Sequence, residues 1–290
     1  MRLFVTGCES FVGRELLAQS TAMGIECTGI DSAPVIRSGF EQLDIRSPQV
    51  EQALPWDVDA VIHLAAISRD ADCVGRLNDT FDVNVMGTLN LMRAAMARRA
   101  RQFVFASSEW VYDSCGAGRV KTEDSVIDIA QHTSEYALSK LVAESVLRQQ
   151  FLRGFCDTTI LRFGIIYGPR TSNWSAVESI CHAVQTGETV CIGSLDTARR
   201  FIHVSDIGLG IIKAVGLPGF TIVNLEGSQL VRLEDIIRVA SRVLGKEPRI
   251  EAAGGAANVR DVSGEKAARL MGWAPLIGLE QGLRSVLAES

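Results

Sequence analysis

The 290-residue sequence lacks the features that mark several classes of protein. No apolar run approaches the roughly 18 residues of a membrane-spanning helix. The first residues, Met1–Gly7, enter a strand-like run and a glycine turn at once, which leaves no room for a signal peptide. The net charge is −5 and the arginines are scattered, so nucleic acid is not an expected partner. We therefore expect a cytoplasmic protein without a membrane segment.

The seven cysteines form no CxxC pair and no His/Cys cluster with metal-ligand spacing. No disulfide framework and no metal site are therefore predicted, and the cysteines are expected to be small buried hydrophobic residues in a reducing compartment. The sequence also lacks the G-x-S-x-G turn that presents the nucleophile of many serine hydrolases.

The composition is 47% hydrophobic, which is ample for a continuous core and excludes a disordered chain. Apolar runs bounded by turn residues alternate with segments of helical period. This alternation predicts an α/β fold with a doubly wound parallel sheet. The expected strands are 3–6, 26–30, 60–65, 102–107 and 158–163, and the expected helices between them are 11–23, 81–97 and 135–152.

The alternation breaks down after Gly168-Pro169, where shorter elements follow. We predict a domain of residues 1–167 and a smaller C-terminal lobe of residues 168–290, with sheet elements from about 200–225 returning to the first domain. The expected elements of the lobe are a strand at 189–192 and helices at 174–185, 206–215, 233–244, 265–271 and 279–288.

A glycine turn, Thr6–Gly13, follows the first strand and opens the first helix. Its glycines let the backbone approach a pyrophosphate, and the helix N-terminus supplies free N–H groups and a positive dipole end. Ser10 stands at the middle of the three usual glycine positions. An ordinary strand-to-helix connection is the alternative interpretation.

Asp31 ends the second strand, 24 positions after Gly7, where a carboxylate accepts hydrogen bonds from the adenosine ribose. Its charge repels the 2′-phosphate of NADP, and no arginine follows until Arg37, so the predicted cofactor is NAD. The alternative is that Asp31 caps a turn. Asp44-Ile45, between the strands expected at 26–30 and 60–65, stands where an adenine is expected.

Tyr136 and Lys140 are four residues apart on a predicted helix and so share one face. A nearby ammonium favours phenolate, so Lys140 is expected to lower the pKa of Tyr136 below about 10. Ser107-Ser108 lie at the carboxyl end of the strand expected at 102–107, where a serine hydroxyl can hold the substrate oxygen. A tyrosine base, a lysine that lowers its pKa and a serine that holds the substrate oxygen together make a site for hydride transfer. A Ser-Ser turn without a chemical role is the alternative.

Three histidines are weaker candidates. His63 and His203 each lie in an apolar run and are expected to be packed core residues, and His132 lies alone in a polar loop.

Taken together, these motifs resemble the NAD-dependent epimerase/dehydratase family, the extended short-chain dehydrogenases, which include UDP-glucose 4-epimerase and nucleotide-sugar 4,6-dehydratases. The resemblance covers nearly the whole chain. It implies a Rossmann-like NAD domain, a smaller substrate-binding lobe that closes over a nucleotide diphosphate sugar, and a homodimer. The matching segments are Thr6–Gly13, Val61–Ala66, Asn84–Asn90, Ser107–Tyr112, Tyr136–Lys140, Leu161–Arg170, Arg199–Asp206 and Gly272–Pro275.

The resemblance also implies residue roles. Tyr136 is the base, Lys140 holds the nicotinamide ribose, and Ser108 assists at the sugar C4 oxygen. Asn84 supports the site around Lys140, and Arg199 binds the substrate pyrophosphate with bidentate donors. Besides Tyr136 and Lys140, the implied cofactor residues are Gly7, Ser10, Phe11, Val12, Gly13, Asp31, Asp44, Ile45, Leu64, Ala65, Ala66, Asn84, Ser107, Phe163 and Gly164. The implied substrate residues are Ser108, Glu109, Trp110, Tyr136, Ile165 and Arg199.

The chain departs from the family pattern at several positions. Glu109 is followed by Trp110 instead of a second acid, which disfavours a 4,6-dehydratase because water elimination needs a second acid/base group. Ile165 stands where many members have Asn, Arg200 where they have Asp, and Asp113 where a glycine is common.

We therefore predict a nucleotide-sugar 4-epimerase that oxidises the C4 hydroxyl transiently and recycles its NAD in place. A 4-keto-sugar reductase or a sugar dehydrogenase, which exchanges its cofactor at each turnover, is the enzymatic alternative. A catalytically inactive dinucleotide-binding protein is the alternative from another class, although Tyr136 and Lys140 are both present.

Overall fold

The computed structural model describes residues 1–115, 118–172 and 174–289. The chain forms two compact units that exchange segments along the sequence. Unit 1 comprises Met1–Cys115, Ser125–Arg162 and Gly208–Val223, and unit 2 comprises Gly116–Asp124, Phe163–Ile207 and Asn224–Ser290. The domain boundary expected at residue 167 stays a prediction.

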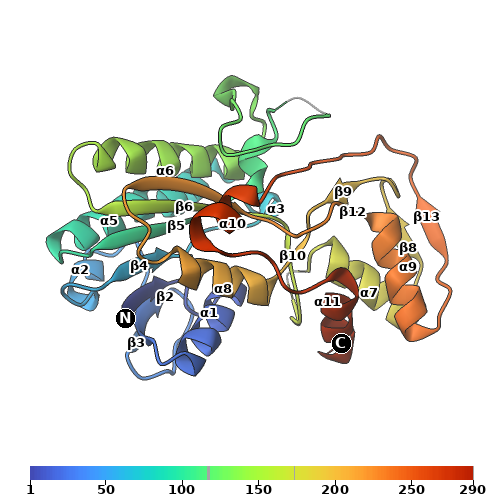
Figure 1. Ribbon diagram of the computed structural model, residues 1–290, viewed down its shortest axis with the longest axis horizontal. Coiled ribbons are helices and arrows are strands. Elements are labelled where there is room, and N and C mark those ends of the chain that lie inside the picture. Colours follow the sequence, from blue (N-terminus) through green and yellow to red (C-terminus); the bar gives the residue numbers. More distant parts are fainter. Residues whose placement is uncertain (116–117, 173, 290) are drawn as a thin grey trace. The chain divides into compact units, whose positions relative to one another are not determined.

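A seven-stranded sheet, with the order β11-β6-β5-β4-β1-β2-β3, forms the centre of unit 1 (Figure 1). Strand β1 pairs in parallel with β2 on one side and with β4 on the other, so the strand order reverses beside β1. Ligands bind at such a switch point in open α/β sheets, outside the carboxyl ends of the strands. This sheet confirms the predicted doubly wound α/β fold. Its strands are β1 (Arg2–Thr6), β2 (Glu26–Asp31), β3 (Phe40–Gln42), β4 (Ala60–His63), β5 (Gln102–Ser108), β6 (Asp157–Phe163) and β11 (Phe220–Leu225).

Strands β4 and β5 are buried along their whole length, because helices cover both faces of the sheet. Helices α5 and α6 lie on one face, and α1 and α8 on the other (Figure 1). The core between the sheet and the first of these faces includes Phe4, Val61, Leu91, Phe103 and Leu147. The longer helices are α1 (Phe11–Ala22), α5 (Thr88–Ala97), α6 (Glu135–Phe151) and α8 (Val204–Ala214), and the short ones are α2 (Val50–Ala53), α3 (Asp70–Cys73), α4 (Leu77–Phe81), η2 (Glu109–Tyr112) and η3 (Ile129–Gln131).

The helix expected at 81–97 is interrupted by a π-helical turn, η1 (Asp82–Gly87). A π-turn has an i→i+5 hydrogen-bond pattern that the 3.6-residue period does not reveal. The prediction of one continuous α-helix is therefore wrong in this segment, which contains Asn84.

Unit 2 has its own core, in which α7, α9 and α11 pack against one another. Their apolar faces bring together Val177, Ile180, Ile236, Ile237 and Leu283. Short strands pair beside them, with β9 antiparallel to β12, β8 parallel to β13 and β7 parallel to β10. The elements are β7 (Ile166–Tyr167), α7 (Ala176–Thr186), β8 (Val190–Ile192), β9 (Ala198–Arg199), β10 (Ile202–His203), β12 (Val231–Arg232), α9 (Leu233–Leu244), β13 (Ile250–Ala252), α10 (Glu265–Met271) and α11 (Leu279–Glu289).

Among the described residues, no helix has both the length and the apolar character needed to cross a bilayer. The cytoplasmic location stays a prediction. All seven cysteines are free. Cys8, Cys73 and Cys181 are buried as expected, but Cys191 is exposed, so the expectation of a buried residue is wrong there.

Candidate active site

The glycine loop, Gly7–Gly13, lies at the carboxyl end of β1. Gly7 has a φ of +73°, and a Cβ on it would lie 2.7 Å from the backbone nitrogen of Ala65. A Cβ on Gly13 would collide with the carbonyl oxygen of Gly7. Both positions therefore need glycine because backbone packs against backbone. The Ser10 hydroxyl accepts a hydrogen bond from the Gly13 amide at 3.1 Å and caps α1, which gives a physical reason for a serine at this position.

The residues after β4 run beside this loop. The Leu64 amide donates to the Thr6 carbonyl oxygen at 3.1 Å, and the Ala65 amide donates to the Thr6 hydroxyl at 3.4 Å. Phe11 and Val12 lie in the first turn of α1, where backbone N–H groups have no acceptor within the helix. The structure thus brings Leu64–Ala66 next to the glycine loop at one edge of the sheet.

Asp31 connects the end of β2 to the glycine loop. One carboxylate oxygen accepts from the Glu9 amide at 2.8 Å, and the other accepts from the Ala33 amide at 2.9 Å. The second bond is the local turn that was the alternative interpretation of this residue. A carboxylate offers about four acceptor positions, so Asp31 can also accept from ribose hydroxyls.

Asp44 is already paired. Arg46 contacts Asp44 at 2.7 Å and Asp82 at 2.8 Å. The hydrogen bond from Arg46 lowers the pKa of Asp44. Ile45 is buried and packs on Gly87 of the π-turn, where a Cβ would lie 2.5 Å from the Ile45 Cδ1 atom. The adenine role of Asp44 and Ile45 stays a prediction.

Asn84, in the π-turn, holds the end of β4 to α6. Its Oδ1 accepts from the Ile67 amide at 2.8 Å, and its Nδ2 donates to the Ile67 carbonyl oxygen and to the Ser139 hydroxyl, both at 3.0 Å. The Ser139 hydroxyl donates in turn to the Tyr136 carbonyl oxygen at 2.7 Å. Asn84 therefore fixes the backbone that carries Tyr136.

Ser107, Ser108, Tyr136 and Lys140 form a buried group that we call the tyrosine cluster. Tyr136 and Lys140 lie one turn apart on α6, with the Lys140 Nζ atom 5.8 Å from the Tyr136 ring centre. The same Nζ atom donates to the Ala106 carbonyl oxygen at 2.9 Å. Burial lowers the pKa of Lys140 to about 8. The predicted shared face of the helix is confirmed.

The charge state of Tyr136 differs from the sequence-based expectation. Burial raises its pKa to about 12, while a hydrogen bond with the Ser108 side chain acts in the lowering direction. The prediction that Lys140 lowers this pKa below its ordinary value is therefore wrong, because the loss of hydration outweighs every favourable contact.

The two adjacent serines have different partners. The Ser107 hydroxyl donates to Glu144 at 2.5 Å, whereas Ser108 accepts from the Trp110 amide at 3.3 Å and its side chain acts to lower the pKa of Tyr136. Ser108 is thus the serine that acts on the phenol. Glu109 beside it is fully buried and Trp110 is partly buried.

Sequence reasoning missed two charged residues that support this cluster. Arg162 on β6 makes a buried bidentate pair with Glu144, with distances of 2.6 and 3.0 Å, and donates to the Tyr112 hydroxyl at 2.8 Å. Two features of the sequence could have revealed this pair: Glu144 lies one helical turn after Lys140, and Arg162 lies within an apolar strand.

The histidines behave as expected. His63 bridges the hydroxyls of Thr6 and Thr88 at 2.8 and 2.9 Å, and burial lowers its pKa to about 3. His203, in unit 2, is buried and lies 3.1 Å from the Ser285 hydroxyl. Both are confirmed as packed core residues.

The remaining predicted residues, Phe163, Gly164, Ile165 and Arg199, belong to unit 2. An Arg199 Nη1 donates to the carbonyl oxygens of Ala198 and Asn258 at 2.8 and 2.6 Å. Arg200 forms an ion pair of 2.5 Å with Asp261, which explains an arginine at this position within unit 2 itself. The cofactor and substrate roles of the four predicted residues stay predictions.

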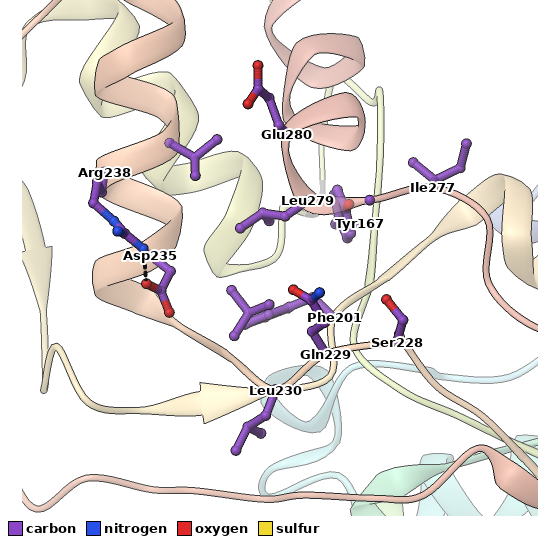
Figure 2. A pocket seen from close by; sticks show the side chains of 13 residues that line it. Tyr167, Phe201, Ser228, Gln229, Leu230, Asp235, Arg238, Ile277, Leu279 and Glu280 are labelled. Carbon is purple, nitrogen blue, oxygen red and sulfur yellow. Dashed lines mark hydrogen bonds and ion pairs between the residues drawn. The ribbon is translucent and has the colours of Figure 1, made fainter.

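A cavity of about 430 Å³ lies in unit 2 among α9, the start of α11 and residues 228–231 (Figure 2). None of the predicted site residues lines it. The charged groups at its rim are paired, Asp235 with Arg238 at 2.5 Å and Glu280 with Arg242 and Arg284 at 2.5 and 2.7 Å. We assign the cavity no part in the chemistry.

The glycine loop beside β1 and the group of Ser108, Tyr136 and Lys140 are consistent with the family that the sequence matches. Residues 3–224 match the NAD dependent epimerase/dehydratase family, and the chain belongs to this family of enzymes. Among the similar solved structures, a UDP-glucose 4-epimerase from Thermus thermophilus contains NAD, and RMD from Pseudomonas aeruginosa contains NADPH.

Three similar proteins span most of the chain. UDP-glucuronate 4-epimerase from Thermodesulfobacterium geofontis is 28% identical over 254 residues, which is 84% of this chain and 77% of that protein. GDP-6-deoxy-D-mannose reductase from Pseudomonas aeruginosa is 27% identical over 304 residues, or 99% of this chain and 96% of that protein. The structure of RMD from Pseudomonas aeruginosa complexed with NADPH has a TM-score of 0.84 and 26% identity, and the match covers 99% of this chain and 98% of that one.

Proposed function

We propose that this protein is an NAD-dependent nucleotide-sugar 4-epimerase. The observation that carries the proposal is the buried pair of Tyr136 and Lys140 on α6, with the Lys140 Nζ atom 5.8 Å from the Tyr136 ring centre. Ser108, which ends β5, acts on the phenol as well. A phenol beside an ammonium and a serine hydroxyl, at the carboxyl end of a parallel strand, is suited to exchange a proton with the hydroxyl of an alcohol. The similarity to a UDP-glucuronate 4-epimerase supports a nucleotide sugar as the substrate.

The residues of the glycine loop fit a dinucleotide. Gly7 and Gly13 have no side chain where two backbone segments pack closely. The N-terminus of α1 offers amides and a positive dipole end to a pyrophosphate. Asp31 has a fixed carboxylate at the end of the neighbouring strand. A 2′-phosphate carries about −1.5 to −2 charges and is repelled there, so we infer NAD in preference to NADP.

In the proposed reaction, Tyr136 takes the proton of the sugar C4 hydroxyl, and Ser108 orients the two oxygens by hydrogen bonding. The ammonium of Lys140 stabilises the phenolate by its positive charge. A bound NAD⁺ supplies the hydride acceptor at C4. When the C4 carbonyl is reduced again on its other face, Tyr136 returns the same proton, so the proton balance of a turnover is zero. The burial of the cluster excludes water from these transfers.

A 4-keto-sugar reductase is the second candidate. The reductase from Pseudomonas aeruginosa covers nearly the full length of this chain, and Ile165 and Arg200 depart from the pattern of many nucleotide-sugar enzymes. Trp110, which takes the place of a second acid, argues against a 4,6-dehydratase. The homodimer stays a prediction.

The cofactor separates the two candidates. We would denature the purified protein and identify the released dinucleotide by mass spectrometry. An epimerase that recycles its cofactor should release close to one NAD per chain. Release of NADP(H) alone would contradict the NAD assignment, and recovery of no dinucleotide would favour the exchanging reductase.

The substrate class is tested by thermal unfolding in the presence of UDP, GDP, CDP and dTDP sugars. A ligand at 100 times its Kd adds about 2.7 kcal/mol to the free energy of unfolding. Absence of a shift with all of them would count against nucleotide sugars.

A further inference from the structure

A buried carboxylate lies directly behind Lys140. Glu144 is one turn further along α6, and its side chain is 6% exposed. It accepts three hydrogen bonds, from the Ser107 hydroxyl at 2.5 Å and from two nitrogens of Arg162 at 3.0 and 2.6 Å. Ser107 and Arg162 are themselves 2% and 4% exposed. The carboxylate is therefore fixed from three directions and screened from water.

Two hydrogen bonds join the end of β5 to α6. Lys140 donates to the Ala106 carbonyl oxygen at 2.9 Å, and the Ser107 hydroxyl donates to Glu144. Successive side chains of a strand point to opposite faces. Fixing Ser107 against Glu144 therefore also fixes the direction of Ser108, whose side chain acts to lower the pKa of Tyr136.

Glu144 also sets the charge balance around Lys140. Lys140 and Arg162 are both buried cations. Three other titratable groups act on Lys140, are acted on by it or lie beside it: Cys73 of α3, His63 of β4 and Tyr136, whose ring centre lies 5.8 Å from the Nζ atom. Burial holds the imidazole and the phenol neutral near pH 7. Burial lowers the pKa of Lys140, and the negative charge of Glu144 is the largest effect in the opposite direction.

We propose that Glu144, held by Arg162 and Ser107, is a positioning residue for hydride transfer: it keeps the ammonium of Lys140 charged and holds Ser107, and with it the end of β5, against α6. The proposal rests on the proposed function only in assigning Tyr136 and Lys140 to the reaction. The effect of Glu144 on the charge of Lys140 can be measured without any substrate.

The direct test is the titration of Lys140 by NMR. The protein contains five lysines, so labelling Lys Cε with carbon-13 gives few signals, and the Lys140→Met variant assigns the one from Lys140. In the native chain this signal should titrate near pH 8. In Glu144→Gln the midpoint should fall by about one pH unit or more, because the amide carries no compensating charge. An unchanged midpoint would overturn the proposal.

Two further variants keep this test decisive. Glu144→Gln leaves the Arg162 charge uncompensated, which destabilises a fold strongly, so the double variant Glu144→Gln/Arg162→Gln is measured in parallel. It removes one negative and one positive charge, so its midpoint should lie between those of the native chain and Glu144→Gln. Glu178→Gln is the matched control. Glu178 is 2% exposed and paired with Arg170 at 2.8 Å in unit 2, so its loss removes a comparable ion pair but should leave the Lys140 midpoint unchanged.

Turnover of UDP-glucuronic acid, used as the probe sugar, gives the second readout. The alkaline limb of kcat should move to lower pH in Glu144→Gln and return toward the native position in Glu144→Asp. A fall in kcat without movement of this limb would show a purely structural role and would overturn the proposal. If no sugar is turned over but the NMR midpoint moves as expected, the proposed function fails and the role of Glu144 in the charge of Lys140 stands.

Discussion

The glycine loop and the tyrosine cluster both lie in unit 1, but they are built in opposite ways. The loop offers backbone amides and the partly exposed carboxylate of Asp31, and its geometry depends on glycines that leave room for backbone. The tyrosine cluster offers buried side chains with displaced pKa values, about 12 for Tyr136 and about 8 for Lys140. Substitutions in the loop should therefore change dinucleotide binding, whereas substitutions in the cluster should change chemistry and charge.

The largest effect is expected from Tyr136→Phe, which removes the proton carrier and keeps the ring. Loss of a general acid/base lowers kcat by about 10²- to 10⁴-fold. Dinucleotide binding should stay within the native range because the loop is untouched. Initial rates with UDP-glucuronic acid, together with assay of bound dinucleotide, check both statements.

Tyr167→Phe is the matched control for this variant, because Tyr167 is also a buried tyrosine but lies in the core of unit 2. It should keep its rate within a few-fold of native. Full activity of Tyr136→Phe would refute the assignment of the base.

Lys140→Met should make the protein more stable at pH 7 while abolishing activity. The pKa of Lys140 falls from 10.5 to about 8 on folding, so the folded state pays roughly 3 kcal/mol for the charged lysine below pH 8. Loss of the bond to the Ala106 carbonyl offsets about 1 kcal/mol of this, which leaves a gain of about 1–3 kcal/mol.

The contribution of Lys140 to the free energy of unfolding depends on pH, and the sign of this dependence follows from its lowered pKa. Between pH 8 and 10.5 the unfolded chain binds more protons at Lys140 than the folded chain does, so the native stability contributed by this group rises with pH. The advantage of Lys140→Met should therefore be largest at pH 7 and shrink toward pH 10. Urea unfolding at pH 7, 9 and 10 measures it, and a constant difference would contradict the burial of a charged lysine.

Tyr136 and Lys140 also show which features of the site the sequence could predict and which it could not. The strands, the glycine turn and the shared face of Tyr136 and Lys140 follow from local periodicity and spacing, and all appear in the structure. The pKa of Tyr136, the π-turn that holds Asn84 and the pair between Glu144 and Arg162 do not follow. They depend on burial and on contacts between segments far apart in the chain, which periodicity does not encode.

In the loop, Asp31→Asn should weaken NAD binding by roughly 10- to 100-fold, because a hydrogen bond to a charged group contributes about 1.5–3 kcal/mol. It should also reduce the preference for NAD over NADP, since the repelling charge is gone. Calorimetric titration with both dinucleotides tests this. Asp59→Asn is the control, because Asp59 accepts from the Arg2 amide at 2.7 Å at the opposite end of the strands. Equal losses in both variants would exclude a direct role for Asp31.

The smallest effect is expected from Ser10→Gly, which restores the three-glycine pattern of the family. Glycine is nearly as good as serine at a helix N-cap, so the free energy of unfolding should change by only a few tenths of a kcal/mol, whereas Ser10→Ala should cost about 1 kcal/mol. Thermal unfolding of the two variants measures the difference. Equal losses would show that Ser10 does not cap α1.

The central claim is a hydride that leaves C4 and returns to it within one active site. The most direct measurement incubates the purified protein, without added dinucleotide, with the nucleotide sugar that gives the largest thermal shift, and follows the sugar by proton NMR. The account predicts that the C4 epimer accumulates over many turnovers per protein chain. No epimer without added cofactor, and a reduced sugar when NADH or NADPH is supplied with the matching 4-keto sugar, would contradict it.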